Sequence, residues 1–333
     1  MIWLSHWEVR IIVEVEYAPS SEHELLVRVA RMYYENDLNQ QEIAERVGLS
    51  RSRISRLLTR AREVGIVQVT IVDAFQEEHE LSRELVAVYS LKRAAVFPIS
   101  ESSPRPLRWH LGQAAARLLR EVIRDGDVIG VTGGTTMLEM ARALRPLKRE
   151  NVKIVQLEGA LSGKGEALIH GNEITAIVAA TFDAPPYFLS APTIVESKQL
   201  RDALARDPNM GRILQKGREA NVAVFSVGRP SKSCILAQAG YLSEEDINML
   251  LYKGAVGDIC SRFFTADGSV CDEALNERTI GLELDELACK ESSILVAGGP
   301  KKIAGIAGAL RGGFANILVT DEATARTLIE VAG

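Results

Sequence analysis

The sequence predicts an α/β protein that joins an N-terminal winged helix-turn-helix to a C-terminal doubly wound, mostly parallel α/β domain. Three observations favour this fold class. Residues 22–65 have a helical periodicity that a glycine turn interrupts, and their second half is basic. A β-rich run follows at residues 66–72. From residue 94 onward, near-continuous apolar runs alternate with helical segments, which is typical of parallel strands covered on both faces.

The composition is that of an ordinary globular chain with enough apolar residues for a large core. Its 333 residues are 47% hydrophobic and carry a formal net charge of −5, so the basic helix is a local feature. No apolar run reaches the roughly 18 residues of a membrane span, and charged residues interrupt the apolar start of the chain. We therefore expect a cytoplasmic protein with no membrane partner. The four cysteines show no CxxC spacing, which predicts reduced, mostly buried thiols and neither a metal site nor a cofactor: Cys234, Cys260, Cys271 and Cys289.

The strongest motif is a helix-turn-helix. A helical pattern covers residues 23–36, and a short helix is predicted at residues 40–47. Gly48 allows the positive φ that a tight turn between two helices needs, and Ser50 can cap the next helix, which starts at Arg51. The spacing of turn and cap predicts that this second helix packs onto the first.

The outward face of that second helix is basic. Small Ala44 allows the two helices to cross closely, and Ile54 and Leu57 hold them together, which leaves the arginines outward. Guanidinium groups there suit guanine edges or phosphates in a DNA major groove; a solvated charged face is the alternative interpretation. We expect contacts to double-stranded operator DNA from Gln40, Gln41, Ser50, Arg51, Ser52, Arg53, Ser55, Arg56 and Arg60.

Two segments link this motif to the second domain. The alternating run at residues 66–72 predicts a strand that forms the wing, with Gln68 and Thr70 on its polar side. Residues 73–93 predict a helical connector that either packs on the second domain or pairs with its copy in a dimer. Its apolar stripe consists of Leu81, Leu85, Val88 and Leu91.

In a parallel sheet, ligands bind beside the carboxyl ends of the strands, and one strand end is suited to a phosphate. A predicted strand ends at Thr132, Gly133 and Gly134 allow close backbone approach, and Thr135 and Thr136 open a helix. Backbone N–H groups at such a helix start can hold a phosphate. Because no GK[ST] follows and the glycine spacing is not GxGxxG, nucleotide hydrolysis is not expected; a plain strand-to-helix turn is the alternative.

Other apolar runs end in polar groups that suit a sugar. A carboxylate can bind sugar hydroxyls and an ammonium can bind a phosphate, although a capping histidine or a solvated lysine would give the same pattern. We expect effector contacts from Glu158, Gly159, His170, Asn172, Asp258 and Lys302.

Together these motifs resemble the SorC family of bacterial sugar-responsive transcriptional regulators. The resemblance rests on the helix-turn-helix, GGTT, HGNEI, LSAP, GYLSEEDINMLLYKGAVGDICSRFFTADG and AGGPKKIAGIAGALRGGFANILVTDEATA, and it runs from about Leu25 nearly to the C terminus. It implies a sugar-phosphate isomerase-like effector domain, homo-oligomers (dimers or tetramers), a phosphate site at GGTT, and ligand-facing positions at Asp258 and Lys302. We therefore expect an N-terminal extension at residues 1–21, the winged helix-turn-helix at 22–72, the connector at 73–93 and the effector-binding domain at 94–333.

Two departures and several alternatives remain. Gly159 is followed by Ala160 where the family commonly has a double glycine, and the first twenty or so residues lie outside the resemblance. A sugar-phosphate isomerase-like enzyme, with Glu158, His170 or Asp258 as a general base, is the competing function. The sequence leaves open the identity and phosphorylation of the effector, the operator sequence, and whether the protein activates or represses.

Overall fold

The computed structural model describes residues 21–34, 36, 38–67, 80–99, 103–160 and 171–332. The chain separates into two compact units, Met1–Gln76 and Glu77–Gly333. Within the described ranges, no helix is both long and apolar enough to cross a membrane.

The first unit is a three-helix helix-turn-helix. It consists of α1 (Ser21–Tyr34), α2 (Gln40–Val47) and α3 (Arg51–Glu63). The predicted limits of α2 and the predicted start of α3 are confirmed, whereas α1 ends at Tyr34 rather than near residue 36. The helices share a small core that includes Val29, Ile43, Ile54 and Leu57. The predicted wing strand lies mainly in residues 68–72, outside the described ranges, and Ile66 and Val67 belong to no strand.

The turn between α2 and α3 has the predicted geometry. Gly48 ends α2 with a φ of 73°, in the left-handed region that glycine adopts without a steric penalty. Ser50 begins α3 as its N-cap, because its hydroxyl accepts a hydrogen bond from the Arg53 N–H. The local sequence therefore determines how α3 leaves the turn.

The second unit is built on a seven-stranded sheet in which every strand pair is parallel. In spatial order the strands are β1 (Arg93–Phe97), β9 (Ile317–Asp321), β8 (Ser292–Val296), β5 (Val222–Phe225), β2 (Val128–Val131), β3 (Lys153–Gln156) and β4 (Pro186–Tyr187). The prediction of a mostly parallel sheet is confirmed. From β2 the chain moves through β3 to β4 at one edge, and β5 returns to the other side of β2 and leads on to β8 and β9.

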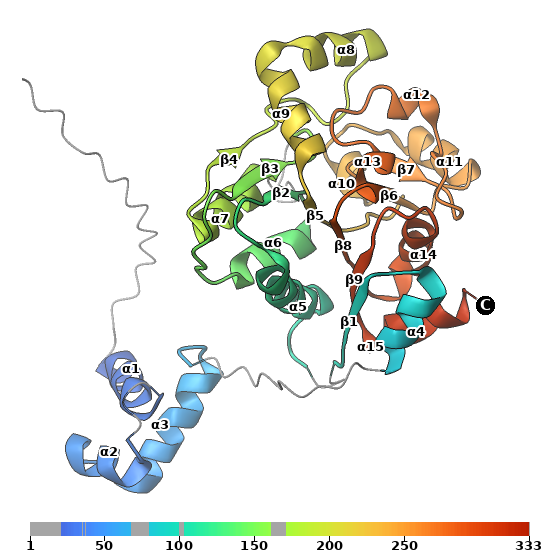
Figure 1. The fold of residues 1–333 in the computed structure, drawn as a ribbon. Helices are drawn as coiled ribbons and strands as arrows, with labels where there is room; N and C mark the ends of the chain where they lie inside the picture. The colour runs from blue at the N-terminus through green and yellow to red at the C-terminus, as the bar shows by residue number, and fades with distance from the viewer. Residues whose placement is uncertain are drawn as a thin grey trace, which may run out of the picture. The chain divides into compact units, whose positions relative to one another are not determined.

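Helices cover both faces of this sheet (Figure 1). On one face pack α5 (Leu107–Val122), α6 (Thr135–Ala143) and α7 (Gly171–Phe182). On the other face pack α4 (Glu80–Tyr89), α9 (Pro208–Glu219), α13 (Leu284–Ala288), α14 (Ile303–Arg311) and α15 (Glu322–Glu330). Alternate residues of one strand enter the two cores: Val222 and Val224 join the first, and Ala223 and Phe225 the second. The doubly wound prediction is therefore confirmed.

Helix α4 packs inside the second unit. Leu81 and Leu85 are buried in the core that α4 shares with α15 and β1, as the core-packing interpretation of the connector requires. Val88 was expected on the same stripe, but 45% of it is exposed. The buried side of α4 is centred on Ser82 and Leu85, with Tyr89 packed against the same core, so Val88 lies at the edge of the buried stripe.

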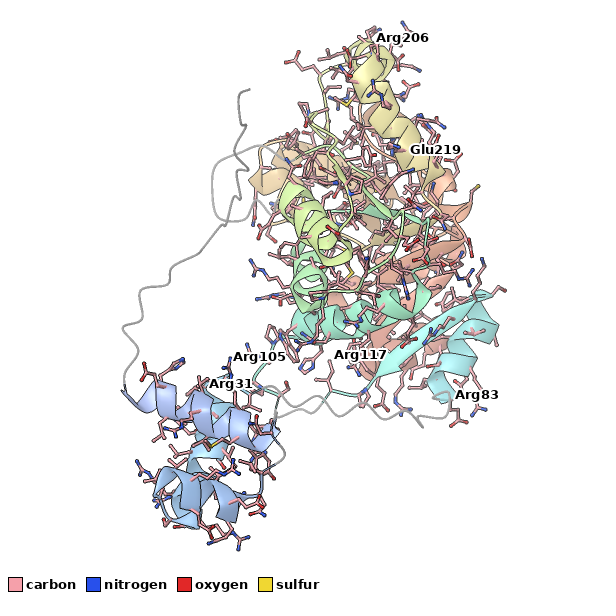
Figure 2. All side chains as sticks on the ribbon, turned by 60° about the vertical axis from the view of Figure 1, so that its left-hand side comes forward. Arg31, Arg83, Arg105, Arg117, Arg206 and Glu219 are labelled. Carbon is pink, nitrogen blue, oxygen red and sulfur yellow. The ribbon has the colours of Figure 1, made fainter. Side chains whose placement is uncertain are left out.

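The remaining elements lie mostly beyond the carboxyl ends of the strands. They are α8 (Lys198–Arg206), α10 (Ile235–Gln238), α11 (Glu244–Tyr252), α12 (Glu273–Asn276), the short helix η1 (Pro300–Lys302), and an antiparallel hairpin of β6 (Gly257–Ile259) and β7 (Arg262–Phe264). Helices α8 and α9 project from this unit, with Arg206 at the tip and Glu219 nearer the body (Figure 2).

Candidate functional site

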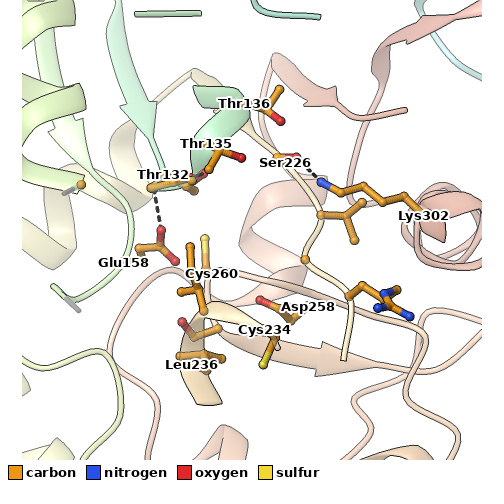
Figure 3. A pocket seen from close by; sticks show the side chains of 18 of the residues that line it. Thr132, Thr135, Thr136, Glu158, Ser226, Cys234, Leu236, Asp258, Cys260 and Lys302 are labelled. Atoms are coloured by element: carbon orange, nitrogen blue, oxygen red, sulfur yellow. Dashed lines mark hydrogen bonds between the residues drawn. The ribbon is translucent and has the colours of Figure 1, made fainter. Parts of the chain in front are cut away.

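A cavity of about 380 Å³ opens where the strand order reverses, at the carboxyl ends of β2, β3 and β5 (Figure 3). Ligands of open α/β sheets bind at such a point because the helices on either side diverge there. The cavity brings together most of the predicted effector residues: Thr132, Gly133, Gly134, Thr135, Thr136, Glu158, Gly159, Asp258 and Lys302.

The GGTT segment forms one wall as the start of a helix. Gly134, with a φ of 113°, precedes α6 and provides no side-chain cap. The first hydrogen bond of the helix runs from the Leu138 N–H to the Gly134 carbonyl, so the N–H groups before Leu138 have no partner inside the helix. The positive end of the helix dipole and these donors therefore lie at the cavity wall, an arrangement that suits an anion.

Glu158 follows β3 and crosses to the GGTT wall, where its Oε1 accepts a hydrogen bond of 2.6 Å from the Gly133 N–H. Burial raises the pKa of Glu158 to about 7, an effect that this hydrogen bond opposes and the nearby Asp258 reinforces. Near neutral pH the carboxyl group can thus donate as well as accept a hydrogen bond, which suits a sugar hydroxyl.

Asp258 comes from the β6–β7 hairpin. The expectation that Asp258 follows a strand of the main sheet is wrong, because β6 pairs with β7 in a separate two-stranded sheet. A backbone bridge between Asp258 and Gly228 joins the hairpin to the chain after β5, through hydrogen bonds of 2.8 and 3.3 Å. A Cβ atom on Gly228 would lie 2.1 Å from Asp258 Oδ1. Glycine at 228 therefore leaves the space that the carboxylate occupies.

Lys302 supplies a cation to the same cavity. Its Nζ donates a hydrogen bond of 3.4 Å to the Ser226 hydroxyl. Burial lowers the pKa of Lys302, whereas Asp258 raises it. Burial likewise raises the pKa of Asp258 to about 6, and Lys302 opposes this change. Figure 3 shows both groups facing the hollow that Thr135 and Glu158 border from the other side.

Of the predicted effector residues that the structure describes, Asn172 is not brought to this cavity. Asn172 is exposed on the first turn of α7 and does not line it, whereas its neighbour Gly171 does. His170 lies outside the described residues. Lys301 is exposed and absent from the lining, so the two adjacent lysines differ in position.

The chain after β5 forms a wall of the cavity that the sequence did not predict. Ser226 and Gly228 line the cavity, as do Cys260, Ser261 and most residues between Arg229 and Leu236. The signal for Ser226 was present, since it directly follows the apolar run that forms β5. Nothing local indicates the residues from 229 to 236, because they reach the cavity only through the fold.

The cysteines also differ in part from expectation. All four are free thiols, but only Cys260 is buried; Cys234 and Cys271 are partly exposed and Cys289 is exposed. Burial raises the pKa of the Cys260 thiol well above its usual range. Within the described ranges, no three His, Cys, Asp or Glu side chains gather closely enough to hold a metal ion.

The first unit presents the predicted nucleic-acid interface on α3. Gln40 is partly buried, and the other predicted residues of α2, the turn and α3 are exposed. In α3, Ile54, Leu57, Leu58 and Ala61 are buried, so the arginine side chains leave the helix on its opposite side. This places Arg51, Arg53 and Arg56 on an accessible surface near the start of α3.

A helix-turn-helix unit combined with an α/β unit that has a polar cavity at its switch point defines a ligand-responsive transcriptional regulator. Residues 28–64 match the family model "Sigma-70, region 4", and residues 73–330 match "Putative sugar-binding domain". The chain belongs to the SorC family of bacterial sugar-responsive transcriptional regulators.

Named relatives cover nearly the whole chain. The deoxyribonucleoside regulator of Bacillus subtilis is 39% identical over 310 residues, which are 92% of this chain and 97% of that protein. The sorbitol operon regulator of Klebsiella pneumoniae is 30% identical over 93% of this chain and 99% of its own length. The crystal structure of the full-length sorbitol operon regulator from Klebsiella pneumoniae superposes with a TM-score of 0.76 at 32% identity, covering 93% of this chain and 99% of that one.

Because of the two cavity carboxyl groups, we expect the second unit to lose stability as the pH rises. Their pKa values in the fold, about 7 for Glu158 and about 6 for Asp258, exceed those of the unfolded chain. The folded state therefore binds more protons between roughly pH 4 and 7, and stability that is fully present below this range is lost across it. We expect the melting temperature of ligand-free protein to fall by a few degrees between pH 5.5 and 8, and Glu158→Gln to reduce that fall. An equal fall in this variant would contradict the role given to Glu158.

Proposed function

We propose that this chain is a sequence-specific DNA-binding regulator whose operator affinity is modulated by a small phosphorylated sugar or polyol. The main support for this proposal is the cavity in the second unit. The start of α6, whose free N–H groups suit an anion, lines the same hollow as the Lys302 ammonium and two carboxyl groups, Glu158 and Asp258. The helix start and the ammonium suit a phosphate, and the two carboxyl groups suit hydroxyl groups.

The size of the cavity supports a small polar ligand. Its volume of about 380 Å³ lies in the lower part of the usual range for ligand pockets, roughly 300–1,000 Å³. Seryl and threonyl hydroxyl groups contribute much of the wall beside the charged side chains, including Ser226 and Thr135. Such a lining should bind a ligand with several hydroxyl groups more tightly than an apolar ligand, because buried polar groups need hydrogen-bond partners.

The regulatory mechanism that we propose is a population shift between two arrangements of a homodimer or homotetramer. Recognition helices can bind two DNA half-sites together only when their spacing matches about 10 base pairs or a multiple. An effector that binds one arrangement better moves operator affinity by the difference between its two affinities, typically about 1–3 kcal/mol. Because bacterial operator DNA lies in the cytoplasm, we also propose that the protein is cytoplasmic.

We further propose that the protein binds its effector without converting it. The raised pKa of Glu158 would also suit a general base of an isomerase. The joined helix-turn-helix and the regulator names of the relatives favour binding alone.

The decisive experiment compares binding, turnover and DNA release in one panel of compounds. Because of the names of its relatives, the panel contains a deoxyribonucleoside, 2-deoxyribose, sorbitol, and phosphate esters of both polyhydroxy compounds. We expect calorimetry to detect saturable binding of one ester, its unphosphorylated partner to bind at least tenfold more weakly, and the ester to shift the DNA affinity of the full chain. Conversion of the ester into an isomer would overturn the proposal of binding without catalysis. If no compound of the panel changes the DNA affinity, the proposed control of operator affinity by such an effector would be contradicted.

A further inference from the structure

The exposed surface of α3 divides into three stripes. Residues Ser52, Arg56, Thr59 and Glu63 follow one another at helical spacing and are all exposed. They lie opposite the buried stripe of Ile54, Leu57, Leu58 and Ala61. The side chains that point most directly away from the helix-turn-helix core are therefore those of this central stripe.

The other arginines flank the central stripe on its two sides. Arg53 and Arg60, seven residues apart, share one flank, and Arg51 and Arg62 share the other. Each flank carries two exposed guanidinium groups, whereas Arg56 is the one cation of the central stripe of α3. A helix inserted in a major groove directs its central stripe at the base edges and its flanks at the phosphates on either side.

The two ends of α3 also differ. Near its start, the Ser50 and Ser52 hydroxyl groups are hydrogen-bonded at 3.0 Å, and Ser52 lies one turn before Arg56 on the same stripe. Near its end, Arg60 Nη1 forms a 3.2 Å ion pair with Glu63, whose carboxylate continues the central stripe. A carboxylate facing DNA repels phosphates, so the first half of α3 is the part suited to enter the groove.

We infer that Arg56, with Ser52 beside it, determines sequence preference by contacting base edges, whereas Arg53 and Arg51 bind the two phosphate backbones. This inference rests on the proposed DNA-binding function. The base that Arg56 selects is guanine, because a guanidinium group can donate two parallel hydrogen bonds to guanine O6 and N7. Ser52 adds a shorter contact to a neighbouring base. The flanking arginines contribute affinity that is independent of sequence.

The test is a binding-site selection from random double-stranded DNA, performed with the full-length protein and its variants. We expect the wild-type protein to enrich a sequence with a guanine in each half-site. Arg56→Ala should lose the preference at that position, a change of roughly 5- to 150-fold in relative affinity, while the other positions keep theirs. Arg53→Ala should retain every base preference and bind all sites more weakly, with a salt dependence shallower by about 0.9 per lost phosphate contact.

The matched control is Arg28→Ala, which removes one exposed positive charge from α1 of the same unit. It should retain both the base preferences and the salt dependence of the wild-type protein. Thermal unfolding of each variant verifies that these exposed substitutions leave the fold intact. If Arg56→Ala keeps the guanine preference, or if Arg53→Ala loses a base preference, the division of roles is wrong. If the wild-type protein itself enriches no sequence, the proposed DNA-binding function fails before the variants are compared.

Discussion

Replacing Lys302 with alanine is expected to weaken binding of a phosphorylated effector by roughly 10- to 150-fold, the equivalent of about 1.5–3 kcal/mol for a hydrogen bond to a charged group. Lys302 is the lysine of the cavity, and its Nζ is held at the wall by the Ser226 hydroxyl. Its removal takes away the ammonium that complements a phosphate and the charge that offsets Asp258. Calorimetry with the phosphate ester and its unphosphorylated partner measures the loss, which should be larger for the ester.

The neighbouring residue provides the control for this prediction. Lys301 has the same side chain one position earlier, but it is exposed and does not line the cavity. Lys301→Ala should therefore bind the effector like the wild-type protein, and both variants should retain the operator affinity measured without effector. Equal losses in the two variants would mean that general electrostatic attraction, and not a contact in the cavity, explains the role of Lys302.

Gly228→Ala is expected to reduce effector affinity at least tenfold through its effect on Asp258. The added Cβ would lie 2.1 Å from Asp258 Oδ1, far closer than two such atoms can approach. Either the carboxylate must leave its position or the bridge between Gly228 and Asp258 must open. Each change displaces a carboxyl group that lines the cavity and that we propose contacts the effector. Calorimetric affinity for the phosphate ester measures the loss, and operator binding and the melting temperature show whether the unit remains folded.

Two variants separate a displaced carboxylate from general damage to the fold. Gly217→Ala adds a Cβ in α9 whose nearest neighbour, Leu157 Cδ2, would be 3.6 Å away, an ordinary contact. It should leave effector binding unchanged and stabilise the helix slightly, by up to about 1 kcal/mol. Asp258→Asn keeps the shape but removes the charge, so it should reproduce the affinity loss of Gly228→Ala without its steric strain. Wild-type affinity in Asp258→Asn would exclude this carboxylate from effector binding.

The helix-turn-helix could be predicted residue by residue because its determinants are local. The positive φ of Gly48, the Ser50 cap and the start of α3 at Arg51 each depend on atoms within a few positions along the chain. Helical periodicity then separated the buried side of α3 from its basic side. The limit of this approach appears at α1, where the pattern continues to Asn36 but the helix ends at Tyr34.

The cavity could be predicted only in part, because its walls come from positions far apart in the sequence. The strand-end rule located Glu158 and the GGTT segment, since each directly follows a strand of the parallel sheet. It did not indicate that a hairpin at 257–264 would bring Asp258 against Gly228. The same rule favoured Asn172, which the orientation of α7 leaves exposed and outside the cavity lining.

The sequence alone determined the class of each unit, because secondary structure, caps and the alternation of strands and helices are set by neighbouring residues. Tertiary structure decided which of these residues share one cavity. Strand order places β5 next to β2 and β8 next to β5, and these pairings bring Ser226 and Lys302 opposite Thr135 and Glu158. The fold also raised the pKa of Glu158 and of Asp258, because burial removes the water that would stabilise their charged forms.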